Sequence, residues 1–250
     1  MEAGQVRRNS AFKRTLSLLR SRPLAALALL PFFVFVLLAA AVTFSTSFYQ
    51  ADFQAALWVN GLGVGATLNA VFVSAALYGR EYFWVPVVGL VFLFGDRRTR
   101  LLALGLALVF LVGIAAGEVA KALVMRERIA VFIGQGSFAS LPSFSLRVPF
   151  DTDFSFPSGH ALIVSIGAVY SLATFRRRWV ASLLAVEAAV VCFSRVYVGA
   201  HYPTDVLGGI ALGAAIAFGG IAVNQLFFRD RASRLGAYLE KVFGKGRLSL

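Results

Sequence analysis

Both histidines of the chain lie in short motifs whose residue types could transfer a phosphoryl group. His160 ends the sequence Pro-Ser-Gly-His at 157–160, and His201 lies between the Ser-Arg pair at 194–195 and Asp205. One imidazole can take phosphate as a nucleophile while a second protonates the leaving oxygen. Hydroxyl, backbone amide and cationic groups can neutralise the phosphoryl oxygens at the same time. These motifs therefore hold the groups for phosphoryl transfer without a metal.

His201 and Asp205 are four residues apart, across the expected start of the last helix. At this spacing the carboxylate can hold one ring nitrogen, fix the tautomer and leave the other nitrogen free to attack. The alternatives are a helix cap formed by Asp205 or Thr204 and an interfacial histidine. Arg195, beside Ser194 at the end of the preceding helix, could equally be a residue whose side chain snorkels to the membrane surface.

The sequence at 157–160 is typical of a helix start. Pro157 suits the first turn, so Ser158, Gly159 and His160 occupy the turn where free amides and the helix dipole favour an anion. Gly159 also lets an oxyanion approach the backbone closely. A helix start alone would explain the first three residues, but the histidine that follows favours a phosphate site.

Lys121 and Arg128 are seven residues apart, which is two helical turns. If the helix continues through Met125, both cations project from one face and can clamp a phosphate. The alternative is a pair of residues that snorkel at the membrane edge. Arg126 is a rival for the role of Arg128, but its five-residue spacing from Lys121 directs it away from that face.

The composition indicates a membrane protein. The chain has 250 residues, of which 59% are hydrophobic and 14% charged, and its mean hydropathy is +0.78. Soluble domains are about 45–50% apolar. The net charge of +12 could indicate nucleic acid, yet the basic residues form short clusters between apolar runs, which is typical of topology control, so no nucleic-acid partner is expected. Cys192 is the single cysteine, which excludes an internal disulfide.

The apolar segments predict an all-α fold, an integral membrane bundle of six helices, each near the length of about 20 residues that a span needs. The expected spans are 24–45, 70–95, 101–123, 158–175, 179–198 and 205–228. Arg80 and Glu81 interrupt the second span. The segment Ala66–Tyr78 could therefore be interfacial or re-entrant, with a shorter span that starts near Tyr82.

The distribution of Lys and Arg predicts the orientation. Basic residues concentrate in the two tails and in the turns at 97–100 and 176–178, all on one side of the six-helix arrangement. The positive-inside rule makes that side cytoplasmic, so both termini are expected inside and the motifs outside, in the cell membrane. We expect one membrane domain, 24–228, between a basic tail, 1–23, and a basic amphipathic tail, 229–250. The second tail could lie on the inner leaflet or fray in water.

The motifs together resemble those of the type 2 phosphatidic acid phosphatase family, membrane lipid phosphatases related to vanadium haloperoxidases. The family motifs are Lys, six residues, Arg-Pro; Pro-Ser-Gly-His; and Ser-Arg, five residues, His, three residues, Asp. The second and third are matched in full. The first is matched at Lys121 and Arg128, with Ile129 in place of the proline. The resemblance covers roughly residues 70–228.

The resemblance implies a role for each motif residue. His201 would be the nucleophile that forms a phosphohistidine, Asp205 its orienting partner, and His160 the acid and then the base. The residues expected to bind the phosphoryl oxygens are Lys121, Arg128, Ser158, Gly159 and Arg195, with Ser194 at the same edge. The family requires no cofactor and no divalent metal.

The expected function is hydrolysis of a lipid phosphate or diphosphate on the outer face, with a polyprenyl diphosphate as the first choice. Phosphatidic acid, phosphatidylglycerol phosphate and a lipid A phosphate present similar chemistry, and a lipid phosphotransferase would use the same phosphohistidine. An anion transporter would need polar residues through the bundle, whereas the helices below His160 and Asp205 are almost wholly apolar. The sequence indicates no oligomeric state.

Three features outside the motifs carry further expectations. Glu118, one turn before Lys121, could orient or neutralise that lysine. Glu187 lies mid-membrane, where an ionisable group is by default functional, although a protonated glutamate could also form a hydrogen bond between helices. The connection 129–156 is rich in phenylalanine. It is expected to form an outer lid, a lip past which lipid enters, or a packed cap.

Overall fold

The computed structural model describes residues 26–135 and 144–243. Across these ranges the chain forms helices and no extended strand, which confirms the all-α class. The first helical segment is Ala26–Phe44. The helices that follow are α2 (Thr46–Asn60), α3 (Gly65–Tyr78), α4 (Glu81–Phe94), α5 (Arg97–Val124), α6 (Ile129–Gln135), α7 (Gly159–Thr174), α8 (Arg178–Tyr197) and α9 (Pro203–Phe243).

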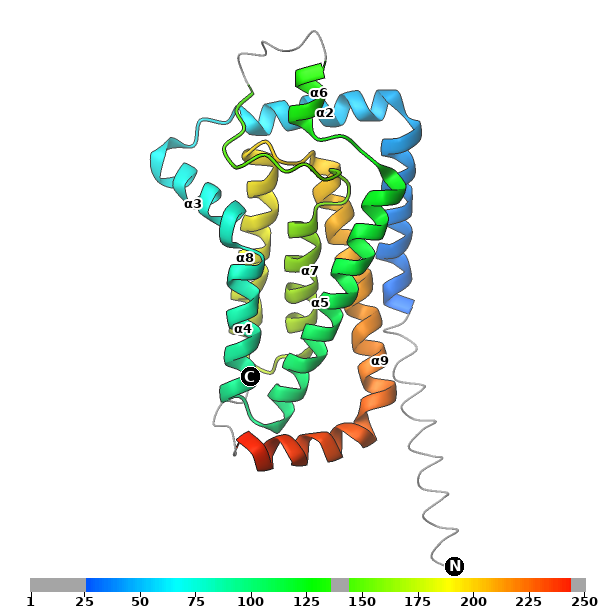
Figure 1. Ribbon diagram of the computed structural model, residues 1–250, viewed down its shortest axis with the longest axis vertical. Helices are drawn as coiled ribbons and strands as arrows, with labels where there is room; N and C mark the ends of the chain where they lie inside the picture. The colour runs from blue at the N-terminus through cyan, green and yellow to red at the C-terminus, as the bar shows by residue number, and fades with distance from the viewer. Residues whose placement is uncertain (1–25, 136–143, 244–250) are drawn as a thin grey trace, which may run out of the picture.

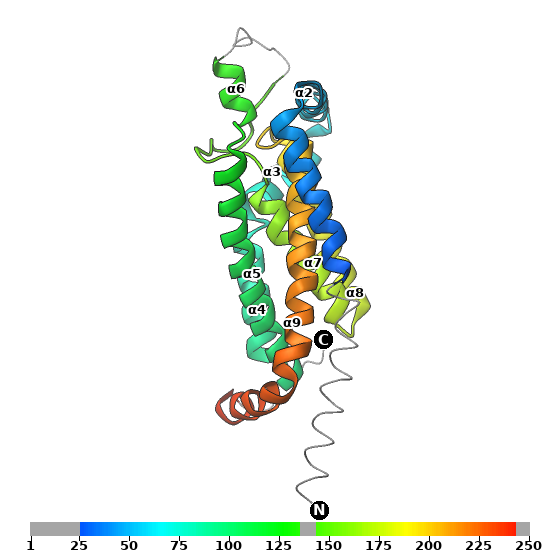
Figure 2. The ribbon, with the colours of Figure 1, turned by 90° about the vertical axis from the view of Figure 1, so that its right-hand side faces the viewer.

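Helix α7 lies in the centre of the bundle, with α5, α8 and α9 packed around it (Figures 1 and 2). Most of its residues are buried, which explains why its sequence is apolar all round rather than on one face. Helix α4 packs on α5 and α3 packs on α8. The central position of α7 makes its amino-terminal end, which carries His160, a fixed point of the fold.

Glycines on α9 allow a close approach to α7. A Cβ on Gly209 would lie 2.5 Å from the carbonyl oxygen of Ser158, and a Cβ on Gly213 would lie 2.5 Å from that of Leu162. Two small residues four positions apart on one face are the usual means by which membrane helices pack backbone to backbone. This contact holds the amino-terminal ends of α7 and α9 together.

The expected single helix at 70–95 is wrong. The chain breaks at Gly79 and Arg80, and α3 and α4 meet at an angle of 67°. Gly79 is pressed against α8, where a Cβ would lie 2.3 Å from Cγ2 of Val191. The alternative division, with Ala66–Tyr78 separate from a span that starts near Tyr82, agrees with the structure.

Four of the described helices are long and apolar enough to cross a membrane, and the bent pair α3–α4 would make a fifth. Helix α7 has 16 residues and is apolar but shorter than these spans. At 1.5 Å per residue it is about 24 Å long, against about 30 Å for a hydrocarbon core. The multi-pass bundle is therefore shown, whereas the number six stays a prediction.

Helix α2 was not expected, and it lies across the end of the bundle where α5 ends and α7 and α9 begin (Figure 1). Ser45 caps it, because the Ser45 hydroxyl accepts a hydrogen bond from the amide of Phe48 at 3.4 Å. Its buried residues include Asp52, Phe53 and Ala56, so one face is turned to the bundle. The missed signal is this short amphipathic pattern, which a search for long apolar runs does not detect.

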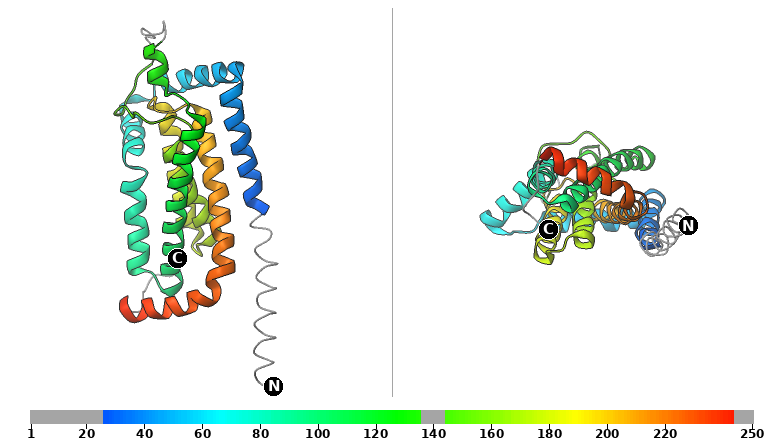
Figure 3. Two further views of the ribbon diagram at one scale, coloured as in Figure 1. Left: turned by 45° about the vertical axis from the view of Figure 1, so that its right-hand side comes forward. Right: turned by 90° about the horizontal axis from the view of Figure 1, so that it is seen from below.

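The opposite end of the bundle carries the basic residues at 97–100, in the first turn of α5, and at 176–178, where α8 begins. There the last part of α9 turns across the bundle (Figures 1 and 3). Helix α9 thus continues into the expected amphipathic tail as far as Phe243. Its last part lies across the end of the bundle, where a helix at the membrane surface would lie. Residues 1–23 of the expected amino-terminal tail lie outside the described residues.

Candidate active site

The three motifs meet at the end of the bundle that α2 covers (Figure 1). Lys121 lies in the last turn of α5, His160 in the first turn of α7, Arg195 in the last turn of α8, and Asp205 in the first turn of α9. His201 lies in the short connection from α8 to α9 and is 2% exposed. Four helix ends, from three separate parts of the sequence, therefore form one site.

His201 has its two ring nitrogens in different surroundings. Nδ1 lies 3.4 Å from Oδ2 of Asp205, and Nε2 lies 3.4 Å from Nη1 of Arg128. Burial lowers the pKa of His201 to about 4, because the Asp205 hydrogen bond, which raises it, does not offset burial and the charges of Arg128 and Arg195. The imidazole is therefore neutral at pH 7, with Nε2 directed toward cations that an anionic substrate could neutralise.

Asp205 is fully buried and has partners on both oxygens. Oδ2 accepts hydrogen bonds from the hydroxyl of Ser155 and, at 2.9 Å, from the backbone amide of Tyr202. Oδ1 accepts from Nη1 of Arg126 at 2.8 Å. These contacts fix the carboxylate that faces His201, and the orienting role of Asp205 stays a prediction.

Arg126 was considered only as a rival for Arg128, and the structure gives it a separate place behind Asp205. Nη1 also donates to Oγ1 of Thr204 at 2.7 Å, and Nη2 donates to Oδ2 of Asp52 at 2.8 Å. Its guanidinium carbon lies 3.7 Å from the ring centroid of Tyr202. We call Asp52, Arg126, Thr204 and Asp205 the rear cluster.

The expected shared helical face for Lys121 and Arg128 is wrong. Helix α5 ends at Val124, and Met125 turns the chain in the left-handed conformation with φ of 49°. Arg128 thus follows the helix instead of continuing it, and Ile129 is buried with Phe53 and Tyr202. The two cations still converge, because both donate to the carboxylate of Asp153.

Two aspartates that the sequence analysis missed contact the expected phosphate-binding cations. Asp153 pairs with Lys121 and Arg128, and Asp151 lies 3.4 Å from Arg128 and 3.5 Å from Arg195. Although partial burial raises the pKa of Asp153, the hydrogen bonds from Lys121 and Arg128 lower it to about 2. We call these five residues the front cluster. Their carboxylates lie where an anionic group would bind.

The remaining motif residues take different places. Ser158 is buried, its hydroxyl caps α7 by accepting from the amide of Ala161 at 3.5 Å, and its own amide donates to the Asp205 carbonyl. His160 and Gly159 are partly buried beside it. The hydroxyl of Ser194 donates to the carbonyl of Val191 within α8 at 2.7 Å. Ser194 thus lies close to the other motif residues, but its hydroxyl donates to a carbonyl of its own helix.

The sequence profile of the PAP2 superfamily matches residues 101–229, which is more than half of the chain. The chain belongs to the PAP2 superfamily. The undecaprenyl-diphosphatase of Sulfolobus acidocaldarius is 42% identical to it over 160 residues, 64% of this chain and 72% of the relative. The bacitracin transport permease protein BcrC of Bacillus licheniformis is 30% identical over 173 residues, 68% of this chain and 79% of the relative.

A crystal structure of a transmembrane PAP2-type phosphatidylglycerolphosphate phosphatase from Bacillus subtilis has the same fold. The TM-score is 0.65 at 26% sequence identity, and the match covers 81% of this chain and 98% of that one. The resemblance that the motifs indicated is therefore confirmed. The protein is a membrane phosphatase of the PAP2 superfamily.

The expectations outside the PAP2 motifs have mixed outcomes. Glu118 pairs with Lys121 at 3.1 Å, as expected. Glu187 lies beside the indole of Trp84 on α4 and not among the motif residues. Part of the connection 129–156 packs as a cap, because Phe132 and Phe144 contact the cluster around Phe53, while residues 136–143 lie outside the described part.

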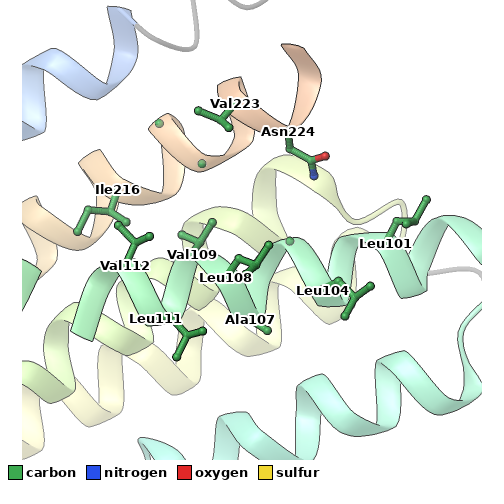
Figure 4. Close-up of a pocket in the computed structure, with 13 residues that line it drawn as sticks. Leu101, Leu104, Ala107, Leu108, Val109, Leu111, Val112, Ile216, Val223 and Asn224 are labelled. Atoms are coloured by element: carbon green, nitrogen blue, oxygen red, sulfur yellow. The ribbon is translucent and has the colours of Figure 1, made fainter. Parts of the chain in front are cut away.

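An apolar pocket of about 560 Å³ lies between α5 and α9, away from the motifs (Figure 4). Leu101, Leu108, Val112 and Ile216 line it, and Asn224 is at one end. Val112 is nine residues before Lys121, which is about 14 Å along an α-helix. The pocket is therefore separate from the cluster of motif residues, which is the candidate reaction site.

Proposed function

We propose that this PAP2 protein hydrolyses a polyprenyl diphosphate through a phosphohistidine at His201. The observation that carries the proposal is the buried, neutral imidazole held between Asp205 and Arg128. The similarity to a protein named undecaprenyl-diphosphatase supports the diphosphate class of substrate.

In the first step, Nε2 of His201 attacks the terminal phosphorus, and the bond from phosphorus to the bridging oxygen breaks. His160 enters this step as the imidazolium and donates one proton to that oxygen, which leaves with the lipid, so that His160 becomes neutral. Lys121, Arg128 and Arg195 neutralise the oxygens of the transferring group. At the start of α7, the amide of Gly159 and the hydroxyl proton of Ser158 donate further hydrogen bonds to it, whereas the Ser158 amide stays bonded to the Asp205 carbonyl. Asp205 stabilises the positive charge that develops on the phosphorylated ring.

In the second step, His160 is neutral and accepts a proton from water. The water oxygen bonds to phosphorus, the bond from phosphorus to Nε2 breaks, and inorganic phosphate leaves. His201 returns to the neutral tautomer with its proton on Nδ1, next to the carboxylate of Asp205. One histidine thus acts as nucleophile and the other as acid and base.

The proposed location of the reaction is the extracytoplasmic face of the cell membrane. The site lies at the end of the bundle opposite to the basic turns at 97–100 and 176–178. Lys and Arg concentrate on the cytoplasmic side of membrane proteins. The prenyl chain would stay in the bilayer while its diphosphate enters the site from the outer surface.

The test is phosphate release by the purified protein in detergent with EDTA, with polyprenyl diphosphate, phosphatidic acid and phosphatidylglycerol phosphate as substrates. We expect the polyprenyl diphosphate to be preferred, EDTA to have no effect, and His201→Ala to abolish release from every substrate. Preference for a glycerolipid would overturn the substrate assignment. Phosphorylation of an added alcohol in place of phosphate release would identify a phosphotransferase, and an active His201→Ala protein would overturn the mechanism.

A further inference from the structure

Arg80 is a cation outside the three motifs, at the break between α3 and α4. Ionisable residues within membrane-spanning segments are costly, and irregular backbone at that depth occurs where it lines a site or is buried in protein. The described ionic partner of Arg80 is its neighbour Glu81, whose side chain is 53% exposed. Because an ion pair with a half-exposed carboxylate stabilises a protein little, Glu81 does not explain why an arginine lies at this break.

The packing on both sides of the break fixes the place of Arg80. Gly79 is pressed against Val191 of α8, as described above. Four residues after Arg80, Trp84 is 2% exposed and covers Gly167 of α7, where a Cβ would lie 2.2 Å from the indole ring. The backbone on both sides of Arg80 therefore packs closely against α8 and α7.

The side chain of Arg80 reaches the start of α7. A Cβ on Gly159 would lie 3.0 Å from Nη1 of Arg80. Arg80 is also one of the cations whose charge acts on the imidazole of His160, together with Arg195 and Arg128. Arg80 therefore lies on the His160 side of the site, and it is the one of these three cations that the motifs do not account for.

In the proposed reaction the His160 side is the side of the leaving group. His201 forms the new bond to the terminal phosphorus, and the bridging bond breaks roughly in line with it, where His160 supplies the proton. For a diphosphate lipid the leaving group is a lipid monophosphate, which carries negative charge of its own. A monophosphate lipid leaves as an alcohol and brings no such charge to this place.

We propose that Arg80 binds the second, non-scissile phosphate and so selects diphosphate over monophosphate lipids. This inference rests on the proposed roles of His201 and His160. A guanidinium suits the task, because it presents paired donors in a geometry that matches phosphate oxygens.

The experiment compares kcat/KM of the full-length protein for a prenyl diphosphate and for the prenyl monophosphate of equal chain length. Arg80→Gln should lower kcat/KM for the diphosphate about ten- to a hundred-fold, the range for losing a charged hydrogen bond, and for the monophosphate less than about three-fold. Arg80→Lys should recover part of the loss because it keeps the charge. Glu81→Gln is the matched control, and it should not lower diphosphate hydrolysis, because it removes only the competing carboxylate.

A second readout uses inhibitors that the enzyme does not cleave. Arg80→Gln should weaken inhibition by methylenediphosphonate and leave inhibition by methylphosphonate unchanged. An equal fall for both substrates, or no fall for either, would overturn the inference. If the wild type cleaved only glycerolipids, the polyprenyl substrate would be wrong, and the inhibitor ratio measured with the glycerolipid would still test Arg80.

Discussion

Two clusters of arginine and aspartate lie on either side of His201, and they differ in how freely their carboxylates meet water. In the rear cluster, the side chains of Asp52, Arg126 and Asp205 are at most 3% exposed. In the front cluster, Asp151 and Asp153 are 49% and 41% exposed. A buried ion pair that loses one member leaves an unpaired charge, whereas an exposed pair contributes little. The ion pairs of the rear cluster therefore hold the fold and Asp205 in place, whereas a bound substrate can displace the carboxylates of the front cluster from their cations.

Removal of the rear arginine should have the largest effect. Arg126→Met leaves Asp52 and Asp205 unpaired, so we expect a loss of about 3–5 kcal/mol in the free energy of unfolding. Misplacement of Asp205 should also lower kcat about a hundred-fold. Thermal unfolding in detergent and steady-state kinetics measure the two effects. Arg147→Met is the matched control, because Arg147 bonds backbone carbonyls of Asn60 and Tyr197.

A pH profile separates positioning from general stability. Without the charge of Arg126, the carboxylate of Asp205 should raise the pKa of His201, so the acid limb of kcat/KM should move to higher pH. A lower kcat with an unmoved acid limb would mean that Arg126 serves only the fold.

The next largest effect is the fall of kcat/KM of the wild type at acid pH. Because the pKa of His201 is about 4, kcat/KM should be independent of protonation of this residue near pH 7. It should fall about ten-fold per pH unit below pH 4. A limb near pH 6.5 would show that the imidazole is exposed to water.

The same histidine should make stability depend on pH. The unfolded chain protonates a histidine near its ordinary pKa of about 6.5, whereas the folded chain does so only near 4. The unfolded state therefore binds more protons between these values, and the contribution of His201 to stability is lost as the pH falls through that range. Comparison of the wild type with His201→Ala in thermal unfolding measures this contribution.

Removal of a front carboxylate should have a smaller and opposite effect on activity. Asp153→Asn removes an anion that competes with phosphate for Lys121 and Arg128, so KM and the inhibition constant of inorganic phosphate should fall about three- to ten-fold. Glu118→Gln is the control, because Glu118 contacts Lys121 from a position that is 65% exposed. It should change both constants less than about two-fold. A rise in KM for Asp153→Asn would show that the carboxylate holds the cations in place.

The sequence was sufficient for residues whose relation is local. The His201–Asp205 spacing crosses one helix start, and the 157–160 motif is itself a helix start, so both could be located without the fold. Arg126 was misjudged because helical spacing no longer applies after Met125 turns the chain. Asp52 was missed for two reasons. Its partner Arg126 lies 74 positions away in the sequence, and Asp52 itself lies on α2, a helix that no long apolar run predicts. The catalytic roles themselves stay predictions.

The position of Asp52 also bears on how members of the superfamily diverge. Asp52 lies on α2, outside the region 101–229 that the PAP2 profile matches, yet its carboxylate balances an arginine inside that region. Arg126 also pairs with Asp205, so loss of Arg126 leaves a buried aspartate unpaired even when Asp52 is absent, whereas loss of Asp52 leaves the Arg126–Asp205 pair intact. We therefore expect relatives that keep the aspartate at the position of Asp205 to keep the arginine behind it, with or without an acid on this helix. Transfer of the 101–229 segment into a foreign amino-terminal scaffold should therefore keep the Arg126–Asp205 pair, and an acid supplied by the scaffold should restore the second ion pair of Arg126.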